Sequence, residues 1–185
     1  MQREKLKVKS TMKSSGKYII FAVLLLIVSW CSISLVRQWK AEKYSAKAGV
    51  LKQYFAGFSI YPAREVSRSL SFYNKSIALY PVKSEYYYNL AKYYEDRSFE
   101  QGISEKERAR WFQKEKDELI KAIKLEPVNA VYHLTLGWVC YQLFIYEKDL
   151  EYKKKAKKEF ELASELYPSK IKIQNYVRTY LSLLE

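Results

Sequence analysis

The residues best suited to nucleophilic or metal chemistry are one histidine and two cysteines, and their placement argues against both kinds of chemistry. Cys31 lies in a long apolar stretch, whereas Cys140 and His133 lie much further along the chain in a predicted helix. We expect the two thiols at different depths, so they can neither form a disulfide nor help to complete the four ligands of a zinc site. The sequence also has no glycine-rich phosphate loop and no serine in a nucleophile elbow. It therefore predicts no catalytic residue, no cofactor or metal, no small-molecule substrate, and a protein that is not an enzyme.

Five lysines cluster at the start of a predicted helix, and two interpretations of them stay open. The first is a solvated helix face. The second is contact with anionic lipid headgroups or an acidic partner, where each basic residue contributes about 1 kcal/mol. Nucleic acid is not expected, because no aromatic residues interleave with this run to stack on bases. The cluster consists of Lys153, Lys154, Lys155, Lys157 and Lys158.

The formal net charge of +13 is concentrated around one apolar stretch. Residues 1–17 carry a net charge of +5 and residues 37–52 carry +4, which leaves +4 for residues 53–185. Basic flanks on either side of an apolar stretch are typical of a membrane anchor. A protein that binds a phosphate backbone would instead carry a basic stripe across its folded domain.

The apolar stretch, residues 18–36, contains no charged residue and is long enough to span a bilayer. At about 1.5 Å per residue, a helix of this length approaches the roughly 30 Å of the hydrocarbon core. A cleaved signal peptide is the competing interpretation, and Ser32 and Ser34 offer a passable cleavage site. Helix-compatible sequence continues without a break through residues 37–47, which favours an uncleaved anchor.

These patterns divide the chain into a basic N-terminal tail (1–17), a single transmembrane helix (18–36), a helical connector (37–49) and a folded domain (50–185). The two flanks of the span differ little in basic residues, so the orientation stays open. The compressed positive charge before the span favours an N-terminus in the cytoplasm and an extracytoplasmic domain.

The domain contains one sequence motif three times: a large apolar residue, a small residue three positions later, and a proline five positions after that. A spacing of three places the large and small residues on one helical face, and the proline ends the helix. We therefore expect stacked helical hairpins, with helices at residues 50–60, 63–79, 84–97, 104–125, 129–147, 150–167 and 169–184. Gly57 and Pro62 mark irregularities in the first, weakest hairpin. The three copies are Tyr73, Ser76 and Pro81; Leu119, Ala122 and Pro127; and Phe160, Ala163 and Pro168.

These motifs resemble the tetratricopeptide repeat (TPR), in which a first helix carries W-x2-L-G-x2-Y and a second carries A-x3-F before a closing proline. The prolines here lie 46 and then 41 residues apart, against about 34 in that family, so the repeats are irregular. The resemblance implies an all-α solenoid of about three hairpins, with the last helix as a C-terminal cap. The residues expected to pack within the repeats are Tyr87, Leu90, Tyr94, Leu119, Ala122, Leu136, Gly137, Ala156, Phe160 and Ala163.

Repeat arrays of this kind present their first helices along a groove that holds a partner peptide. The resemblance therefore implies a groove lined by three helices. Trp138 and Tyr141 could instead pack between repeats, and both possibilities stay open. The basic clamp that some relatives use for a C-terminal carboxylate is not evident. The main groove candidates are Tyr88, Lys92, Leu134, Trp138 and Tyr141, flanked by Glu85, Glu95, Val131, Lys172, Asn175, Thr179 and Ser182.

Together these features predict a membrane-anchored scaffold or adaptor that recruits protein partners. Anchored repeats of this kind resemble accessory parts of bacterial cell-envelope assemblies, which implies a single-pass protein of the inner membrane. The alternative is a small accessory subunit embedded in a larger membrane complex. In that case Ser29, Ser32 and Ser34 would allow close contact between membrane helices.

Overall fold

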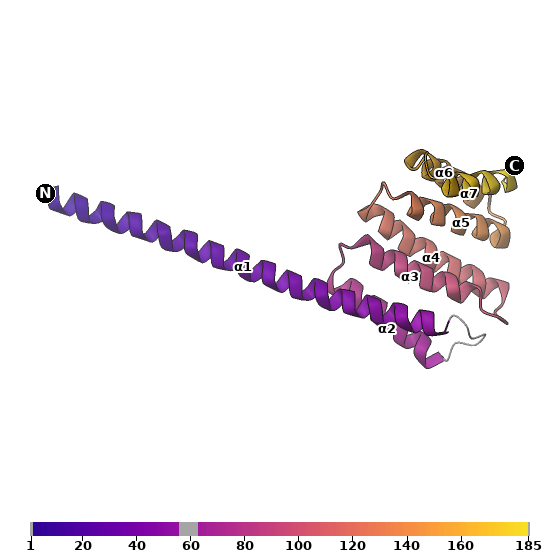
Figure 1. Cartoon of the computed structure of the whole chain (residues 1–185), viewed down its shortest axis with the longest axis horizontal. Helices are drawn as coiled ribbons and strands as arrows, with labels where there is room; N and C mark the ends of the chain where they lie inside the picture. Colours follow the sequence, from indigo (N-terminus) through magenta and orange to yellow (C-terminus); the bar gives the residue numbers. More distant parts are fainter. Residues whose placement is uncertain (1, 56–62, 185) are drawn as a thin grey trace. The chain divides into compact units, whose positions relative to one another are not determined.

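The computed structural model describes the backbone of residues 2–55 and 63–184 and the side chains of residues 18–49 and 67–184. All regular structure in these residues is helical, as the repeat pattern predicted. Gly57 and Pro62, where we expected irregularities, lie outside the described residues. The seven helices are α1 (Gln2–Phe55), α2 (Ala63–Leu79), α3 (Ser84–Ser98), α4 (Glu105–Leu125), α5 (Ala130–Glu147), α6 (Leu150–Leu166) and α7 (Ile171–Leu183) (Figure 1).

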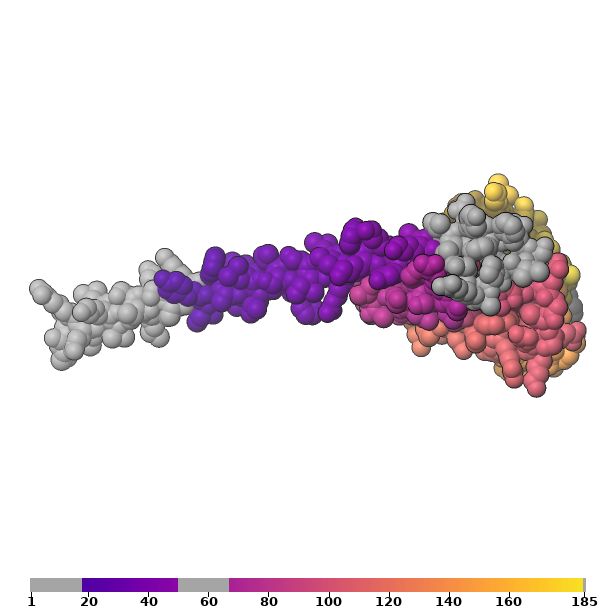
Figure 2. Space-filling model, turned by 90° about the horizontal axis from the view of Figure 1, so that it is seen from below, coloured from indigo at the N-terminus to yellow at the C-terminus, as the bar shows by residue number. Residues whose placement is uncertain are grey.

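The chain separates into two compact units, Met1–Lys40 and Ala41–Glu185. The first unit is the N-terminal part of α1, and its apolar side chains from Tyr18 onward are exposed (Figure 2). Within Tyr18–Gly49, a window with a mean hydropathy of 2.8 has no buried residue. Among the described helices, only this one is long and apolar enough to cross a membrane. The helix continues without interruption through residues 37–49, as the sequence suggested.

The second unit is a stack of antiparallel hairpins in which each helix contacts its neighbours in the sequence (Figure 1). α3 pairs with α4, α5 pairs with α6, and α4 joins the two hairpins by packing against α5. α2 packs against α3 at one end, and α7 packs against α6 and α5 at the other. Such a stack buries the apolar face of each hairpin against the next one.

The first hairpin uses the end of α1 as its first helix. Ala41 and Ala48 are fully buried, and the Ser69 hydroxyl donates a hydrogen bond to the Ala48 carbonyl at 3.4 Å. Tyr44 stacks on Phe72 with ring centroids 5.8 Å apart. The packed unit therefore begins at Ala41, whereas we had assigned residues 37–49 to a connector and expected the domain from residue 50. Ala41 and Ala48 lie on the same face of the helix, and their small side chains allow this close contact even though the segment is rich in charge.

Local capping fixes where three of the helices begin. Ser104 accepts a hydrogen bond from the backbone N–H of Glu107 at 3.2 Å and is the N-cap of α4. Asn129 and Asp149 cap α5 and α6 in the same way, accepting from backbone N–H groups two residues ahead at 3.1 and 2.9 Å. Each cap satisfies a donor that the first helical turn leaves unpaired.

The main core lies between α4, α5 and α6. Phe112, Leu119, Leu143 and Phe160 are fully buried there, and burying each side chain contributes roughly 1.5–3 kcal/mol. The helices approach each other closely at Gly137 of α5. A Cβ atom at that position would lie 2.7 Å from Cδ1 of Phe160. A small residue on one helix thus accommodates the large residue of the next, as the repeat pattern predicted.

Candidate functional site

Eight of the ten residues predicted to pack within the repeats lie in the interior. Tyr87 and Tyr94 are only half-buried, and Tyr86 and Tyr93 take the fully packed positions of α3. The Tyr87 hydroxyl donates to the Pro81 carbonyl at 3.0 Å, which holds it at the turn before the helix. Tyr94 stacks on Trp111 at 5.9 Å. The eight buried residues are Leu90, Leu119, Ala122, Leu136, Gly137, Ala156, Phe160 and Ala163.

His133 is a buried structural residue that joins three segments. Its Nδ1 lies 2.7 Å from Oε2 of Glu159 on α6, and its Nε2 lies 2.9 Å from the carbonyl oxygen of Pro127. The repeat-closing Pro127 is therefore tied to α5 and, through His133, to α6. Both ring nitrogens are engaged, so His133 is not available to act on a ligand. The sequence placed His133 in the core but gave no sign of Glu159 as its partner.

The predicted groove residues of α3 are engaged in contacts within the stack. Tyr88 stacks on Tyr132 with centroids 4.9 Å apart and shares a hydrogen bond with Thr135. Burial raises the pKa of the Tyr88 hydroxyl, so it stays neutral. Lys92 forms an ion pair with Glu95 one turn along the same helix. This part of the face is therefore polar, half-buried and already paired.

The predicted groove residues of α5 also pack between helices. Trp138 makes an edge contact with Phe112 at 5.6 Å and a tilted contact with Phe99 at 5.9 Å. Its indole also hydrogen-bonds Tyr180 of α7, whose ring lies 5.8 Å from that of Tyr141. Leu134 is half-buried against the main core. Of the two possibilities for Trp138 and Tyr141, these contacts favour packing between repeats.

The groove residues predicted on α7 have a different environment. Lys172, Asn175, Thr179 and Ser182 are all exposed. The first three border a shallow hollow of about 570 Å³, which is also lined by Tyr176, Tyr180 and Leu183. Glu85 and Val131 are exposed as well, and the hollow on α7 is lined by three of the predicted groove residues.

Comparison with solved structures identifies the architecture. The first TPR of Spaghetti (RPAP3) bound to an HSP90 peptide superposes with a TM-score of 0.54 at 18% identity, over 80% of this chain and 94% of that one. The Arabidopsis OM64 TPR domain gives a TM-score of 0.53 at 17% identity, over 77% of this chain and 95% of that one. The packed unit has the TPR fold. The second TPR domain of human RPAP3, in complex with an HSP70 peptide, gives 0.50 at 14% identity, over 79% and 96%.

No protein-family model matches the sequence of this TPR-fold chain, and no curated protein matches it either. The likeness is therefore carried by the geometry of the helices and by the few motif residues quoted above. The altered spacing of the repeats accounts for part of this divergence, because each added turn changes the sequence without turning the inward face away from the core.

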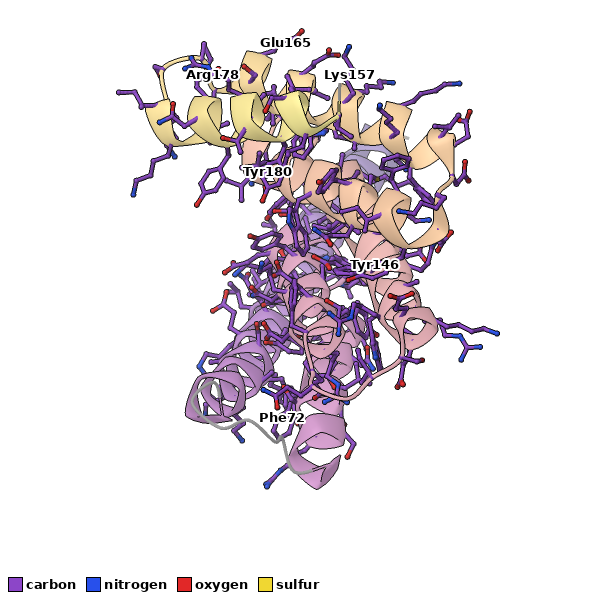
Figure 3. The ribbon with its side chains drawn as sticks, turned by 90° about the vertical axis from the view of Figure 1, so that its right-hand side faces the viewer. Phe72, Tyr146, Lys157, Glu165, Arg178 and Tyr180 are labelled. Carbon is purple, nitrogen blue, oxygen red and sulfur yellow. The ribbon has the colours of Figure 1, made fainter. Side chains whose placement is uncertain are left out.

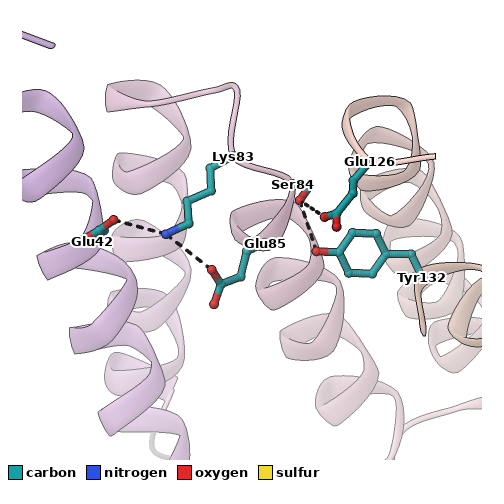
Figure 4. A network of polar contacts seen from close by, with 6 residues as sticks. All are labelled: Glu42, Lys83, Ser84, Glu85, Glu126 and Tyr132. Carbon is teal, nitrogen blue, oxygen red and sulfur yellow. Dashed lines mark hydrogen bonds and ion pairs between the residues drawn. The ribbon is translucent and has the colours of Figure 1, made fainter. Parts of the chain in front are cut away.

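One edge of the TPR stack carries a polar network that joins several helices (Figure 4). Lys83 lies 3.2 Å from the carboxylate of Glu42 and 3.5 Å from that of Glu85. Beside it, Ser84 donates to Glu126 at 2.7 Å and lies 3.2 Å from the Tyr132 hydroxyl. Because the single proton of the serine is directed to Glu126, the tyrosine is the donor in the second contact. Each exposed ion pair contributes at most about 1 kcal/mol, so the network orients the helix ends more than it stabilises them.

The five-lysine cluster lies on α6 and is only partly exposed. Lys154, Lys157 and Lys158 are exposed, whereas Lys153 and Lys155 are half-buried. Lys154 pairs with Glu151 at 3.3 Å, and Lys153 lies 5.9 Å from the ring centroid of Phe144. The cluster is therefore not a uniform basic surface, which favours the solvated-face interpretation of the run.

The cysteines and acidic residues do not assemble a reactive centre in the part of the chain that the structure describes. No group of three or more His, Cys, Asp or Glu side chains in it could hold a metal ion. Cys31 is exposed and Cys140 is buried, and both are free thiols. Burial raises the pKa of the Cys140 thiol to about 12, which keeps it protonated and unreactive at neutral pH.

Proposed function

We propose that this chain is a single-pass membrane protein whose TPR-fold unit recruits or positions protein partners at a cell envelope. One observation carries the proposal: an apolar helix with no buried residue in its spanning window runs without a break into a repeat stack. An isolated apolar helix of this length has to be covered by lipid or protein. The stack provides a face built from successive helices, which is the usual basis of peptide recognition by repeat proteins.

Anchoring gives the stack a functional advantage that does not depend on a strong binding site. Confinement beside a membrane raises the effective concentration of a partner in the same membrane, so weak contacts suffice. Two of the structures of similar fold are bound to HSP90 and HSP70 peptides, which supports a peptide or protein as the class of partner. The absence of an evident carboxylate clamp argues against a chaperone tail as that partner.

The membrane part of the proposal also concerns orientation. The basic residues of 1–17 favour an N-terminus in the cytoplasm, which places the TPR-fold unit outside it. The test is protease digestion of the full chain in intact and in opened bacterial cells, together with the mass of the membrane-extracted chain. We expect an uncleaved chain that resists carbonate extraction and is digested from outside. A chain shortened after Ser34, or found in the soluble fraction, would overturn the anchor.

The scaffold part is tested by crosslinking the full chain in cells and recovering it in detergent. The matched control is a chain whose residues 18–36 are replaced by an unrelated apolar helix. We expect the same reproducible partner with both chains, because the stack and not the span makes the contact. Loss of the partner from the control would favour the embedded accessory subunit instead. Against that alternative, the Ser32 hydroxyl already donates to the Val28 carbonyl of its own helix at 2.8 Å.

A further inference from the structure

The last helix of the stack has an outer face that does not suit a terminal cap. Repeat stacks end on helices with a polar outer face, because that face meets water. On α7, however, Tyr176 and Leu183 are 57% and 56% exposed and lie on the same side of the helix. The buried side of the same helix is separate and contains Ile173 and Val177. α7 therefore has a second apolar surface that no described residue covers.

The residues that line the hollow share one face of α7. At 100° per residue, Lys172, Asn175, Tyr176, Thr179, Tyr180 and Leu183 fall within an arc of roughly 140°. They are the six residues that line the hollow of about 570 Å³. Arg178 lies on another side of the helix from Tyr180 (Figure 3). The hollow thus has an apolar side formed by Tyr176, Tyr180 and Leu183, a polar side that includes Asn175 and Thr179, and a single charged residue, Lys172.

The packing of α7 on α5 indicates what kind of element fits this face. The surface of α5 at Leu134, Trp138 and Tyr141 has a spacing of four and then three residues, and it receives Tyr180 from α7. α7 repeats this spacing at Asn175, Thr179 and Ser182, next to Tyr176 and Leu183. In a stack of similar units, the surface that one helix offers to the next recurs on the following helix. The exposed face of α7 therefore has the same place in the stack as the face of α5 that receives α7, which is where the next helix of such a stack would pack.

The charge of α7 decides which helix would bind. Residues 170–184 contain Lys170, Lys172 and Arg178 and no acidic residue. Two copies of this chain meeting through α7 would bring two basic helices together, and that repulsion disfavours a homodimer. A partner with acidic residues beside its apolar stripe would be attracted instead.

We propose that the open face of α7 binds an acidic amphipathic helix of a partner protein, with an aromatic or aliphatic side chain of that helix inserted between Tyr176 and Leu183. This inference specifies the partner chemistry of the proposed scaffold and rests on that function. The apolar contact supplies affinity, and Lys172 selects acidic flanking residues. The binding mode is a helix laid along a groove, for which anchors spaced three, four and seven residues apart are typical.

The test uses the full chain in neutral detergent and fluorescein-labelled 16-residue helical peptides. Three peptides carry a Leu, Phe or Tyr stripe flanked by Glu, and three matched peptides carry Lys in place of each Glu. We expect at least one Glu-flanked peptide to raise fluorescence anisotropy and to bind at least tenfold more tightly than its Lys-flanked match. Sedimentation of the chain alone should show no self-association through this face.

Three variants assign the binding to the hollow. Tyr176→Ala should weaken the best peptide at least fivefold, and Lys172→Glu should remove the preference for Glu flanks. Arg178→Glu changes the net charge equally but lies outside the hollow, so it should change affinity less than twofold. All three side chains are exposed, and unchanged circular dichroism would show that each variant folds. Equal effects of the two charge reversals, equal binding of both peptide sets, no peptide binding, or α7-dependent dimers would each overturn the proposal.

The partner recovered by crosslinking separates this inference from the scaffold function. If Tyr176→Ala and Lys172→Glu still recover that partner at the level of the unaltered chain, the docking site on α7 is refuted while the scaffold stands. If the unaltered chain recovers no partner, the scaffold itself fails. Loss of the partner from both variants but not from Arg178→Glu supports both proposals.

Discussion

Replacing Gly137 by alanine tests whether close helix contact in the α5–α6 hairpin holds the stack together. The added methyl group would lie 2.7 and 2.8 Å from two ring carbons of Phe160, well inside van der Waals contact. Phe160 has no exposed surface, and its ring stacks on Tyr180 with centroids 5.2 Å apart and an interplanar angle of 6°. The ring therefore cannot move aside without disturbing α7.

Two effects of opposite sign decide the magnitude. Overpacking a filled core costs about 1–3 kcal/mol. Alanine, however, is better than glycine in a helix interior by about 0.8–1 kcal/mol. We expect Gly137→Ala to lower the free energy of unfolding by up to about 2 kcal/mol. Gly49→Ala is the matched control, because no atom lies within 4 Å of a Cβ placed there, and it should be neutral or stabilising by up to about 1 kcal/mol.

The assay is urea unfolding of the full chain in detergent, followed by tryptophan fluorescence, to which Trp138 of the affected hairpin contributes. A double-mutant cycle with Phe160→Leu isolates the clash. In the Leu background, Gly137→Ala should cost at least 1 kcal/mol less than in the unaltered chain, because the planar ring that meets the methyl group is absent. If Gly137→Ala stabilises the chain as Gly49→Ala does, or if the cycle shows no coupling, the argument that the glycine admits the Phe160 ring is wrong.

Three further changes test other parts of the stack. His133→Leu should destabilise the chain by about 2 kcal/mol in the same urea assay, because it leaves Glu159 and the Pro127 carbonyl without their partner, whereas Glu159→Gln, which keeps a hydrogen-bonding group, should cost less. Lys148→Gly should raise the free energy of unfolding by about 0.5–1 kcal/mol, because Lys148 ends α5 at φ 57°, in the left-handed region that favours glycine. A lower free energy of unfolding in this variant would contradict the argument. In a Cys31→Ser background, iodoacetamide at pH 8 should not label Cys140 until urea unfolds the chain. Burial raises the pKa of that thiol from 9.0 to about 12, so the reactive thiolate appears in the folded state only as the pH rises towards 12.

The helix boundaries could be predicted closely because the signals that set them are local. Prolines end α2, α4 and α6, and Ser104 and Asn129 cap the helices that follow, so neighbouring residues determine each end. The burial of Phe160 and Ala163 could be predicted for the same reason, since a large and a small residue three positions apart define a face. The stack therefore follows from short-range patterns repeated along the chain.

Contacts between helices were harder to predict where one sequence pattern is compatible with two ways of packing. Three tyrosines follow one another at positions 86, 87 and 88, so helical periodicity alone cannot decide which of them faces the core. Packing decides it, because Tyr86 is buried and Tyr87 is held at the Pro81 turn. The charged segment at Ala41 also gave no sequence signal of burial, since its lysines suggested a solvated connector.

The proposed binding face of α7 depends on the interior that these predictions probe. Tyr180 lies at the edge of the hollow, and the same ring stacks on Phe160 and is hydrogen-bonded by Trp138. Phe160 can occupy its place only because Gly137 leaves room for it. Gly137 thus determines the position of the Tyr180 ring, and the position of that ring determines the depth of the hollow beside Tyr176. In a stack where each helix is positioned by its neighbour, a docking site on the outermost helix is only as well ordered as the packing of the helices beneath it.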